Sequence, residues 1–455
     1  MTAAREVDVL IVGAGPAGLA AAARLAAAGA GRVEVLDRER QPGGTPRHCA
    51  HGGYGTLLHP LTGPAYARLL VAAAGRAGAT VRPGVTALDW AGPLSLHTVG
   101  PDGPETLTAR AVVLATGAHE RPRAARLVPG TRPAGVHTTG ELQRAVHLHG
   151  QRIGTRAVVV GAEDVSYAAA GTVRAAGATV VAMLTEHARP QIAAARAADA
   201  RLRHGIPLLT HTTVAELLGQ GRLSGVRVRH RDGRTAVLPC DTVVFTGDFV
   251  PDHELARRAG LSLDPGTRGP AVDGTLHTSR PGVFAAGSLL HPAESAATAA
   301  RDGVHAAGAV LDHLADADTR TGTDTRTGTD TRAGTGTGTR TERRTAGTGR
   351  PPAVPLTVDP PLRWIAPNRV TPADRLPYVL RTATELTRPV LHVTQNGRVL
   401  HRERLRTALP NRTLRLPADW THRVDPDAGP VRVTVAPHGV FSHGAFSQGA
   451  FPPPC

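Results

Sequence analysis

Short runs of apolar residues alternate with alanine-rich segments over residues 1–313. The apolar runs have the length and the Val, Leu and Ile content of buried strands, and the alanine-rich segments have the composition of helices. Alternation of these two elements is typical of a mostly parallel sheet covered by helices, so the pattern predicts an α/β fold. The predicted strands include residues 7–12, 32–36, 111–114, 156–160 and 180–184.

The pattern changes after residue 314. Residues 315–352 consist mainly of Thr, Gly, Arg and Asp, with few apolar residues to bury, and this composition predicts a disordered linker. Further along, Asn396 and Gly397 separate two apolar runs, which indicates a β-hairpin because both residue types tolerate a positive φ. We therefore expect residues 353–436 to form a small β-rich C-terminal domain, followed by a tail over residues 437–455.

The first predicted strand leads into a glycine-rich turn and then into an alanine-rich helix. Gly13, Gly15 and Gly18 have the spacing G-x-G-x-x-G, in which the glycines permit a tight turn, approach of the backbone to a pyrophosphate, and close helix packing. The next predicted strand is followed by Asp37, at the distance from the turn where a ribose needs an acceptor. These features together predict a dinucleotide site.

Two later segments point to FAD as the dinucleotide. A strand runs into Thr116 and Gly117, and another runs into Gly287 and Ser288 before a candidate helix over residues 291–303. Flavoproteins of the glutathione and thioredoxin reductase class carry both elements in this order, and residues 1–313 resemble that class. The resemblance implies two Rossmann-like domains: an FAD-binding domain over residues 1–120 and 245–314, and an NAD(P)-type domain inserted at residues 121–244. The class usually has Asp where this chain has Ser288.

The inserted domain keeps only part of its own fingerprint. Gly161 follows a predicted strand, but Glu163 and Ser166 stand where the second and third glycines belong. A carboxylate at the second position repels phosphate and obstructs its approach to the backbone. The pattern predicts the fold but disfavours NAD(P) binding, while Glu186 still follows a strand at the position of a ribose acceptor.

In disulfide reductases a Gly-Gly-Thr-Cys segment carries a redox cysteine pair to the flavin. The matching segment here contains Gly44 and Thr45, which the resemblance assigns to the cofactor site, but Pro46 and His51 occupy the two cysteine positions. A dithiol relay is therefore excluded. Potential ligands so close together rarely suit one tetrahedral ion, so no metal site is predicted. A proton-handling group and a purely structural loop both remain open for this segment. The catalytic candidates are His48, Cys49 and His51.

Residues 43–55, 61–67, 158–167, 246–257 and 291–296 resemble a narrower group of flavoproteins. This group comprises the A-type subunits of opine oxidases, the matching subunit of hydrogen cyanide synthase, and the flavin domain of sarcosine oxidase alpha subunits. The resemblance implies a flavoprotein subunit of a dehydrogenase that acts on an amine, an amino acid or a similar small metabolite. It further implies electron transfer to a second flavoprotein or an iron–sulfur subunit, and it assigns Asp248 to the FAD site.

Charge and composition limit the other classes of function. The formal net charge is +15, but the arginines are spread along the chain and aromatic residues make up 3%, which disfavours nucleic-acid binding. The chain contains no lysine, so Walker-type phosphate binding and lysine Schiff bases are excluded. No apolar run is long enough to insert into a membrane and no signal-peptide pattern is present, so a cytoplasmic protein is expected. The alternatives are an NAD(P)H-dependent flavin reductase and a non-catalytic flavin-fold scaffold or sensor.

Overall fold

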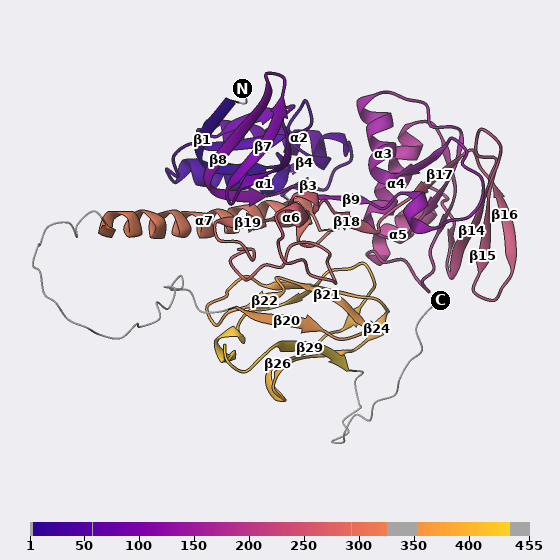
Figure 1. Cartoon of the computed structure of the whole chain (residues 1–455). Coiled ribbons are helices and arrows are strands. Elements are labelled where there is room, and N and C mark those ends of the chain that lie inside the picture. Colours follow the sequence, from indigo (N-terminus) through magenta and orange to yellow (C-terminus); the bar gives the residue numbers. More distant parts are fainter. Residues whose placement is uncertain (1–2, 57, 293, 325–352, 437–455) are drawn as a thin grey trace, which may run out of the picture.

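A computed structural model describes residues 3–56, 58–292, 294–324 and 353–436. The chain forms three lobes: two contain a sheet and helices, and the third consists of strands (Figure 1). Within the described ranges, no helix has both the length and the apolar character needed to cross a membrane.

The first lobe is built on a seven-stranded sheet with the order β5-β2-β1-β8-β7-β6, and β19 also pairs with β8. The pairings of β1 with β2 and β8, of β2 with β5, and of β8 with β19 are parallel, whereas β6 and β7 are antiparallel additions. The apolar runs of β1 and β8 are buried, as expected for central parallel strands. The strands are β1 (Ala3–Val12), β2 (Val33–Asp37), β5 (Thr80–Pro83), β6 (Thr86–Gly92), β7 (Ser95–Gly100), β8 (Gly103–Leu114) and β19 (Val283–Ala285).

Helices α1 (Pro16–Ala27) and α7 (Ala296–Asp324) pack closely against each other in this lobe. A Cβ atom on Gly303 of α7 would overlap the carbonyl of Ala17, so the close approach requires glycine at this position. Just before α7, the buried His291 lies 2.7 Å from Asp302 of the helix, which ties the helix start to its second turn. The lobe also contains α2 (Gly63–Arg76), α6 (Glu254–Arg258), β3 (Tyr54–Gly55) and β4 (Pro60–Leu61).

The second lobe contains a parallel sheet with the order β10-β17-β11-β12-β13 and an antiparallel sheet with the order β14-β15-β16. The strands of the parallel sheet are β10 (Val136–Thr138), β11 (Arg156–Val160), β12 (Thr179–Leu184), β13 (Leu208–Leu209) and β17 (Thr242–Phe245). The antiparallel strands are β14 (Thr212–Leu218), β15 (Gly225–His230) and β16 (Thr235–Pro239), and the helices are α3 (Thr139–Gln143), α4 (Asp164–Ala175) and α5 (Ala194–Leu202).

Two antiparallel strands connect these lobes: β9 (Ala118–Glu120) and β18 (Phe249–Pro251). The chain leaves the first lobe along β9 and returns along β18 (Figure 1). The connectors lie close to the domain limits expected from the sequence, residues 120 and 245, so the second lobe is an insertion in the first.

The third lobe is the predicted β-rich C-terminal domain. Its larger sheet has the order β22-β20-β29-β25-β26, its smaller sheet has the order β21-β23-β28, and Tyr378 and Trp420 are fully buried in its core. The strands are β20 (Val354–Val358), β21 (Leu362–Ala366), β22 (Arg369–Val370), β23 (Tyr378–Thr382), β24 (Leu386–Thr387), β25 (Val390–Gln395), β26 (Arg398–Arg404), β27 (Thr407–Ala408), β28 (Leu414–Leu416) and β29 (Val431–Ala436).

The β-rich domain contacts both other lobes. Arg381 forms a 2.7 Å ion pair with Glu294 of the first lobe, and these two side chains are only 6% and 5% exposed. Asn368 accepts a 2.8 Å hydrogen bond from the backbone N–H of Val272, again in the first lobe. Arg189 of the second lobe pairs with Glu385. The β-rich domain therefore bridges the other two lobes, which also contact each other directly through the ion pair of Glu39 with Arg144 at 3.0 Å.

The α/β fold class and the predicted hairpin are confirmed, and Asn396 and Gly397 both have positive φ, 46° and 77°. Two boundaries were wrong. The helix expected at residue 291 begins at Ala296. It then continues to Asp324, so residues 315–324, predicted as disordered linker, are helical, because alanines near 300–317 let the helix extend past the apolar core. Residues 325–352 and the tail from 437 lie outside the described residues.

Candidate functional site

The glycine turn between β1 and α1 is held in a conformation that larger residues could not adopt. Gly13 has a φ of +108°, and a Cβ atom there would overlap the carbonyl oxygen of Ala115. A Cβ atom on Gly18 would overlap the carbonyl of Gly13. These two glycines therefore let the turn pack against β8 and let α1 pack against the turn.

The middle glycine of this turn faces open space instead. The atom nearest to a Cβ built on Gly15 is the Cα of Gly44, at 4.0 Å. Gly44 itself has a φ of +63°, and a Cβ on it would lie 2.7 Å from the Cα of Gly15. No side chain caps the N-terminus of α1, and its first turn contains no acidic residue. The free N–H groups and the open backbone fit a pyrophosphate group.

Asp37 lies at the end of β2 beside this turn. Its carboxylate accepts hydrogen bonds from the backbone N–H groups of Ala14, at 2.9 Å, and Glu39, at 2.8 Å. Burial raises the pKa of Asp37, although these two hydrogen bonds oppose the shift. Each oxygen keeps a further lone pair with which the carboxylate can accept a ribose hydroxyl.

Other predicted cofactor residues surround the same helix end, with one exception. Gly287, with a φ of +74°, lies against Ala17 of α1, and the half-buried Ser288 follows it. Thr116 donates a 2.7 Å hydrogen bond to the carbonyl of Asp252. Gly117 also has a positive φ, and Thr45 begins a short 3-10 helix directly after Gly44. The exception is Asp248, which lies on the connector and pairs with Arg121 at 3.3 Å rather than with residues of the glycine turn.

The corresponding position of the second lobe is filled by protein. Glu163 precedes α4, and its carboxylate accepts from the backbone N–H of Ser166 in a reciprocal capping arrangement. The carboxylate also packs so closely on Gly247 that a Cβ there would overlap Glu163 Oε1. An internal carboxyl group thus occupies the helix N-terminus at which a dinucleotide fold binds phosphate.

Hydrogen-bonded hydroxyl groups fill the rest of this turn. Ser166 Oγ and Thr246 Oγ1 are 2.6 Å apart, and Thr246 Oγ1 donates to the carbonyl of Val160 at 2.8 Å. A Cβ on Gly161 would overlap Thr246 Oγ1, so the turn keeps its first glycine for internal packing.

Charged groups from the connectors, the second lobe and the β-rich domain surround Glu163. Burial raises the pKa of Glu163 to about 7, with Glu120 and Asp248 adding to the shift and Arg381 and Arg126 opposing it. Arg381 belongs to the β-rich domain, so this domain supplies a counter-charge to the filled turn.

Glu120 and Arg126 lie where the chain enters the second lobe, and both bind the segment along which it leaves. Glu120 accepts from the N–H groups of Gly140, at 2.9 Å, and Gly247, at 3.0 Å. Arg126 donates to the carbonyls of Thr246, at 3.2 Å, and Gly247, at 2.6 Å. Burial raises the pKa of Glu120 and lowers that of Arg126. This hydrogen bonding fixes the filled turn against the connectors.

The family model for pyridine nucleotide-disulphide oxidoreductases matches residues 7–303. The chain belongs to this family. It resembles thioredoxin reductase of T. acidophilum, with a TM-score of 0.59 and 25% identity over 68% of this chain and 99% of that one. The expected family and the two-domain fold are thus confirmed, and the chain is an FAD-dependent oxidoreductase whose glycine turn, Asp37 and open helix end fit that cofactor.

Curated relatives come from several oxidoreductases. A ferredoxin–NADP reductase of Salinispora tropica is 31% identical over 62% of this chain and 86% of its own length. The alpha subunit of sarcosine oxidase from Corynebacterium sp. strain P-1 is 31% identical over 56% of this chain, but only 28% of that protein is covered. The A-type subunit of opine oxidase from Rhizobium meliloti is 30% identical, covering 62% of this chain and 58% of the relative.

This family member lacks the cysteine pair that gives the family its name. Cys49 and Cys240 are both buried and neither forms a disulfide. Cys49 Sγ donates a 3.3 Å hydrogen bond to Gln143 Oε1, and burial raises the pKa of the Cys49 thiol. Burial also raises the pKa of Cys240 to about 11, and the nearby charge of Asp241 adds to that shift. Both groups are therefore neutral thiols at neutral pH rather than nucleophilic thiolates.

The three catalytic candidates do not form one hydrogen-bonded group. His48 is buried, and desolvation, together with Arg144 and Arg47, lowers its pKa to about 4, so its imidazole is neutral at physiological pH. His51 is exposed, and its Nδ1 lies 2.7 Å from the carbonyl oxygen of Gly52. Among the candidates, His51 is the one that a substrate can reach.

Sequence reasoning missed Tyr54, which lies between two of the candidates. Its side chain is hydrogen-bonded with Cys49, and its ring lies 5.6 Å from the rings of His51 and Tyr66. Burial raises the pKa of the Tyr54 phenol, so the group remains protonated and donates hydrogen bonds. A tyrosine between two glycines in an otherwise aromatic-poor chain was the signal that could have identified it.

Proposed function

We propose that this chain is the flavoprotein subunit of a dehydrogenase that oxidises an amine, an amino acid or a similar small metabolite and passes the electrons to a partner protein. When bound, FAD accepts the two electrons released as a substrate C–H bond is oxidised. The observation that carries the proposal is the filled turn of the second lobe, because a family member without that phosphate site needs an electron donor other than NAD(P)H.

The Glu163 carboxylate occupies the N-terminus of α4, where the pyrophosphate of a nicotinamide dinucleotide would bind. Binding of a pyrophosphate requires this side chain to leave Gly247 and Ser166, and the two phosphates then meet a second negative charge nearby in Glu120. This arrangement supports a substrate that is oxidised directly at the flavin.

In the first lobe, the segment from His48 to Tyr54 supplies the groups that would contact a substrate. Tyr54 and Cys49 remain protonated, and the Tyr54 hydroxyl, which is hydrogen-bonded with Cys49, keeps oxygen lone pairs that can accept a hydrogen bond from a substrate. His51 is exposed and is the candidate that can accept the proton of an ammonium group before the adjacent C–H bond is oxidised.

The nature of the relatives supports a partner protein. The relatives from sarcosine oxidase and opine oxidase are both subunits by name, and this chain matches only part of each. We infer that a second flavoprotein or an iron–sulfur protein receives the electrons here as well.

Anaerobic spectroscopy tests the proposal. The purified flavoprotein is mixed with secondary amines, amino acids, NADH or NADPH, and the loss of flavin absorbance is followed. We expect bleaching by one class of small metabolite and little by either nucleotide. The His51→Asn variant should slow that bleaching, whereas His59→Asn, which changes an exposed histidine outside that segment, should not. Rapid bleaching by micromolar nucleotide, with none by the metabolites, would contradict the proposal.

An NAD(P)H-dependent reductase is the second candidate function. The ferredoxin–NADP reductase of S. tropica favours it, because this chain spans 86% of that relative. The same spectroscopic experiment separates the two functions, since a reductase is bleached by nucleotide without any amine.

A further inference from the structure

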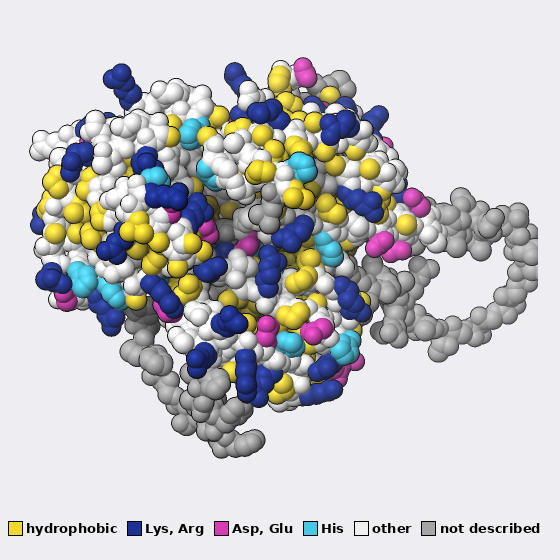
Figure 2. All heavy atoms as spheres, turned by 180° about the vertical axis from the view of Figure 1, so that it is seen from behind, with side chains coloured by type: hydrophobic (Ala, Val, Ile, Leu, Met, Phe, Trp, Pro, Cys, Tyr) yellow, Lys and Arg dark blue, Asp and Glu magenta, His cyan; other side chains and the backbone are white. Residues whose placement is uncertain are grey.

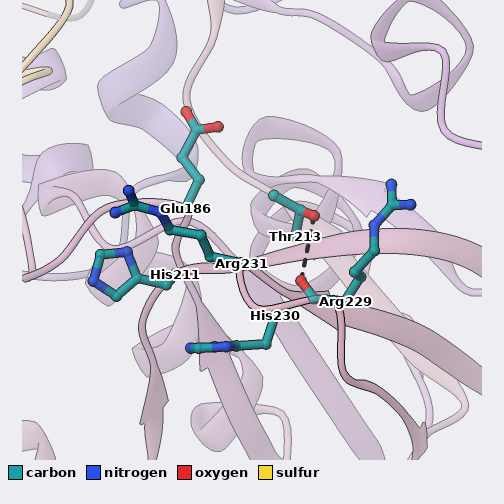
Figure 3. Close-up of a pocket in the computed structure, with 7 residues that line it drawn as sticks. Glu186, His211, Thr213, Arg229, His230 and Arg231 are labelled. Atoms are coloured by element: carbon teal, nitrogen blue, oxygen red, sulfur yellow. Dashed lines mark hydrogen bonds between the residues drawn. The ribbon is translucent and has the colours of Figure 1, made fainter.

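The second lobe keeps part of a nucleotide site. Glu186 follows β12 at the position of a ribose acceptor, and it lines a polar cavity of about 300 Å³ with His211 and Arg231 (Figure 3). This cavity belongs to the nucleotide fold, and the phosphate turn of the same fold is filled by Glu163. The lobe meets the candidate catalytic segment of the first lobe elsewhere, at the end of α3.

The end of α3 is a defined piece of structure. Thr138 and Glu141 form a reciprocal cap that fixes the start of this short helix. Gln143 is its last residue, and a π-helical turn over Arg144–Leu148 follows directly. Such turns are rare and are found frequently at functional sites. Both α3 and the π-helical turn lie next to the 3-10 helix Thr45–His48 of the first lobe.

A buried hydrogen bond joins the two lobes at this point. Gln143 Oε1 lies 3.3 Å from Cys49 Sγ, and the two residues are only 3% and 5% exposed. An amide oxygen accepts hydrogen bonds and cannot donate them, so the Cys49 thiol gives its single proton to Gln143. The Cys49 sulfur is then left as an acceptor for its other partner.

That partner is Tyr54, and the direction of its hydroxyl follows from the same argument. Tyr54 is hydrogen-bonded with Cys49, whose proton is already donated to Gln143, so the phenol donates to the sulfur. The Tyr54 oxygen keeps only lone pairs for any further partner. The rings of His51 and Tyr66 each lie 5.6 Å from the Tyr54 ring and restrict its movement.

We propose that Gln143 is a positioning residue, which sets the direction of the chain Gln143–Cys49–Tyr54 and so fixes Tyr54 as a hydrogen-bond acceptor toward the substrate. This inference rests on the proposed function and deepens it, because the substrate must then present a donor group to Tyr54. It also gives the second lobe a role in substrate binding that needs no nucleotide.

Infrared spectroscopy of the purified flavoprotein tests the chain without any substrate. The S–H stretching band of Cys49 is the one that disappears in Cys49→Ala, which separates it from the bands of the two other cysteines. Gln143→Leu should shift this band to higher frequency, because donation to an acceptor weakens the S–H bond. Arg144→Gln removes the neighbouring ion pair with Glu39 and should leave the band in place.

Anaerobic bleaching of the flavin by the metabolite tests the positioning. Gln143→Leu and Cys49→Ala should each raise the substrate concentration for half-maximal bleaching about fivefold, the scale of one hydrogen bond, and change the limiting rate less than about twofold. The double variant should lose no more than either single variant, because both changes break one chain. Cys49→Ser keeps a donor and an acceptor, so it should restore most of what Cys49→Ala loses.

The two measurements separate the possible failures. An S–H band that stays in place in Gln143→Leu would overturn the chain, whatever the protein oxidises. Additive losses in the double variant, or an equal loss in Arg144→Gln, would overturn the positioning role and leave only a contact between lobes. Absence of bleaching by every metabolite would contradict the proposed function itself, and the infrared band distinguishes that outcome from a broken chain. Flavin absorbance and melting temperature verify that each variant is folded.

Discussion

The two Rossmann-like lobes share a fold but differ at the helix N-terminus where such a fold binds phosphate. In the first, Gly15 faces open space beside an uncapped helix, and the nearest group is the backbone of Gly44. In the second, Glu163 reaches the equivalent helix end and packs on Gly247. The N-terminus of α1 is open to an external anion, whereas the N-terminus of α4 is already bound by the side chain of Glu163.

The difference shows how a dinucleotide fold can be kept while its ligand site is lost. Parallel strands and helix packing depend on the apolar core, which is complete in both lobes. Phosphate binding depends on two or three small residues at one turn, and replacing them leaves that core unchanged. Fold and cofactor use are therefore separable in this molecule.

Arginine is distributed over all three lobes rather than gathered on one face, as Figure 2 shows for one side of the molecule. The charge difference between the two nucleotide turns is therefore local and does not reflect a general field of the protein. Single substitutions at either turn should then have effects specific to that turn.

The largest effect is expected at the open turn. Gly15→Glu places a carboxylate where the FAD pyrophosphate would approach, so the purified variant should lose essentially all bound flavin, measured as flavin absorbance per protein. Gly171→Glu is the matched control, because it adds the same side chain at an exposed position of α4 with no atom within 4 Å. Full flavin content in Gly15→Glu would show that FAD does not bind at this turn.

The next effect concerns the filled turn. Glu163→Gly with Ser166→Gly restores the glycine pattern and removes the internal anion, so flavin reduction by NADH or NADPH should become at least about tenfold faster. Stopped-flow bleaching measures this rate. Asp164→Gly serves as the control, since Asp164 is exposed and pairs with Arg196 outside the turn. If the double variant reacts no faster than the parent protein, Glu163 is not what limits nucleotide use.

The pKa of Glu163 gives a smaller and pH-dependent effect on stability. Because burial raises its pKa to about 7 in the folded protein, the folded state binds more protons than the unfolded state between about pH 4.5 and 7. Its contribution to the free energy of unfolding is therefore fully present at low pH and is lost as the pH rises through 7, by up to about 3 kcal/mol.

Denaturation of Glu163→Gln and the parent protein across pH 5–8 measures this contribution. The difference in stability should shift in favour of Glu163→Gln as the pH rises. His48, whose lowered pKa of about 4 gives the opposite slope, is unchanged in both proteins and cancels in the difference. Arg381→Gln should move the Glu163 transition to higher pH, since it removes an opposing charge. A pH-independent difference would mean that Glu163 is ionised throughout.

Periodicity and glycine spacing were sufficient to predict the α/β fold, both nucleotide turns and the hairpin at Asn396. These features depend on residues close together in sequence, whose effects on backbone conformation are local. The same reasoning identified Glu163 as an obstacle, because a carboxylate at a phosphate turn is unfavourable in any context.

Features that depend on distant residues could not be predicted in the same way. The charge that Arg381 provides near Glu163, and its ion pair with Glu294, join three lobes that no local pattern relates. The hydrogen bond of Tyr54 with Cys49 likewise arises from tertiary packing. The length of α7 was missed because its last residues lack the apolar spacing that marked its beginning.

Ser288 provides the smallest test, on the side of the open turn. It is half-buried in the short 3-10 helix Gly287–Leu289, next to the glycine that packs on α1, and the reductase class usually has Asp at this position. A carboxylate makes a stronger hydrogen bond to a hydroxyl than a serine does, by about 1 kcal/mol, so Ser288→Asp should bind FAD roughly fivefold more tightly. Titration of the flavin-free protein with FAD measures the dissociation constant.

Ser288→Asn is the control, because it keeps the size of the new side chain without its charge, and it should leave the affinity for FAD within about twofold of the parent protein. If Ser288→Asp instead weakens FAD binding, the new carboxylate meets the phosphates of the cofactor rather than one of its hydroxyl groups.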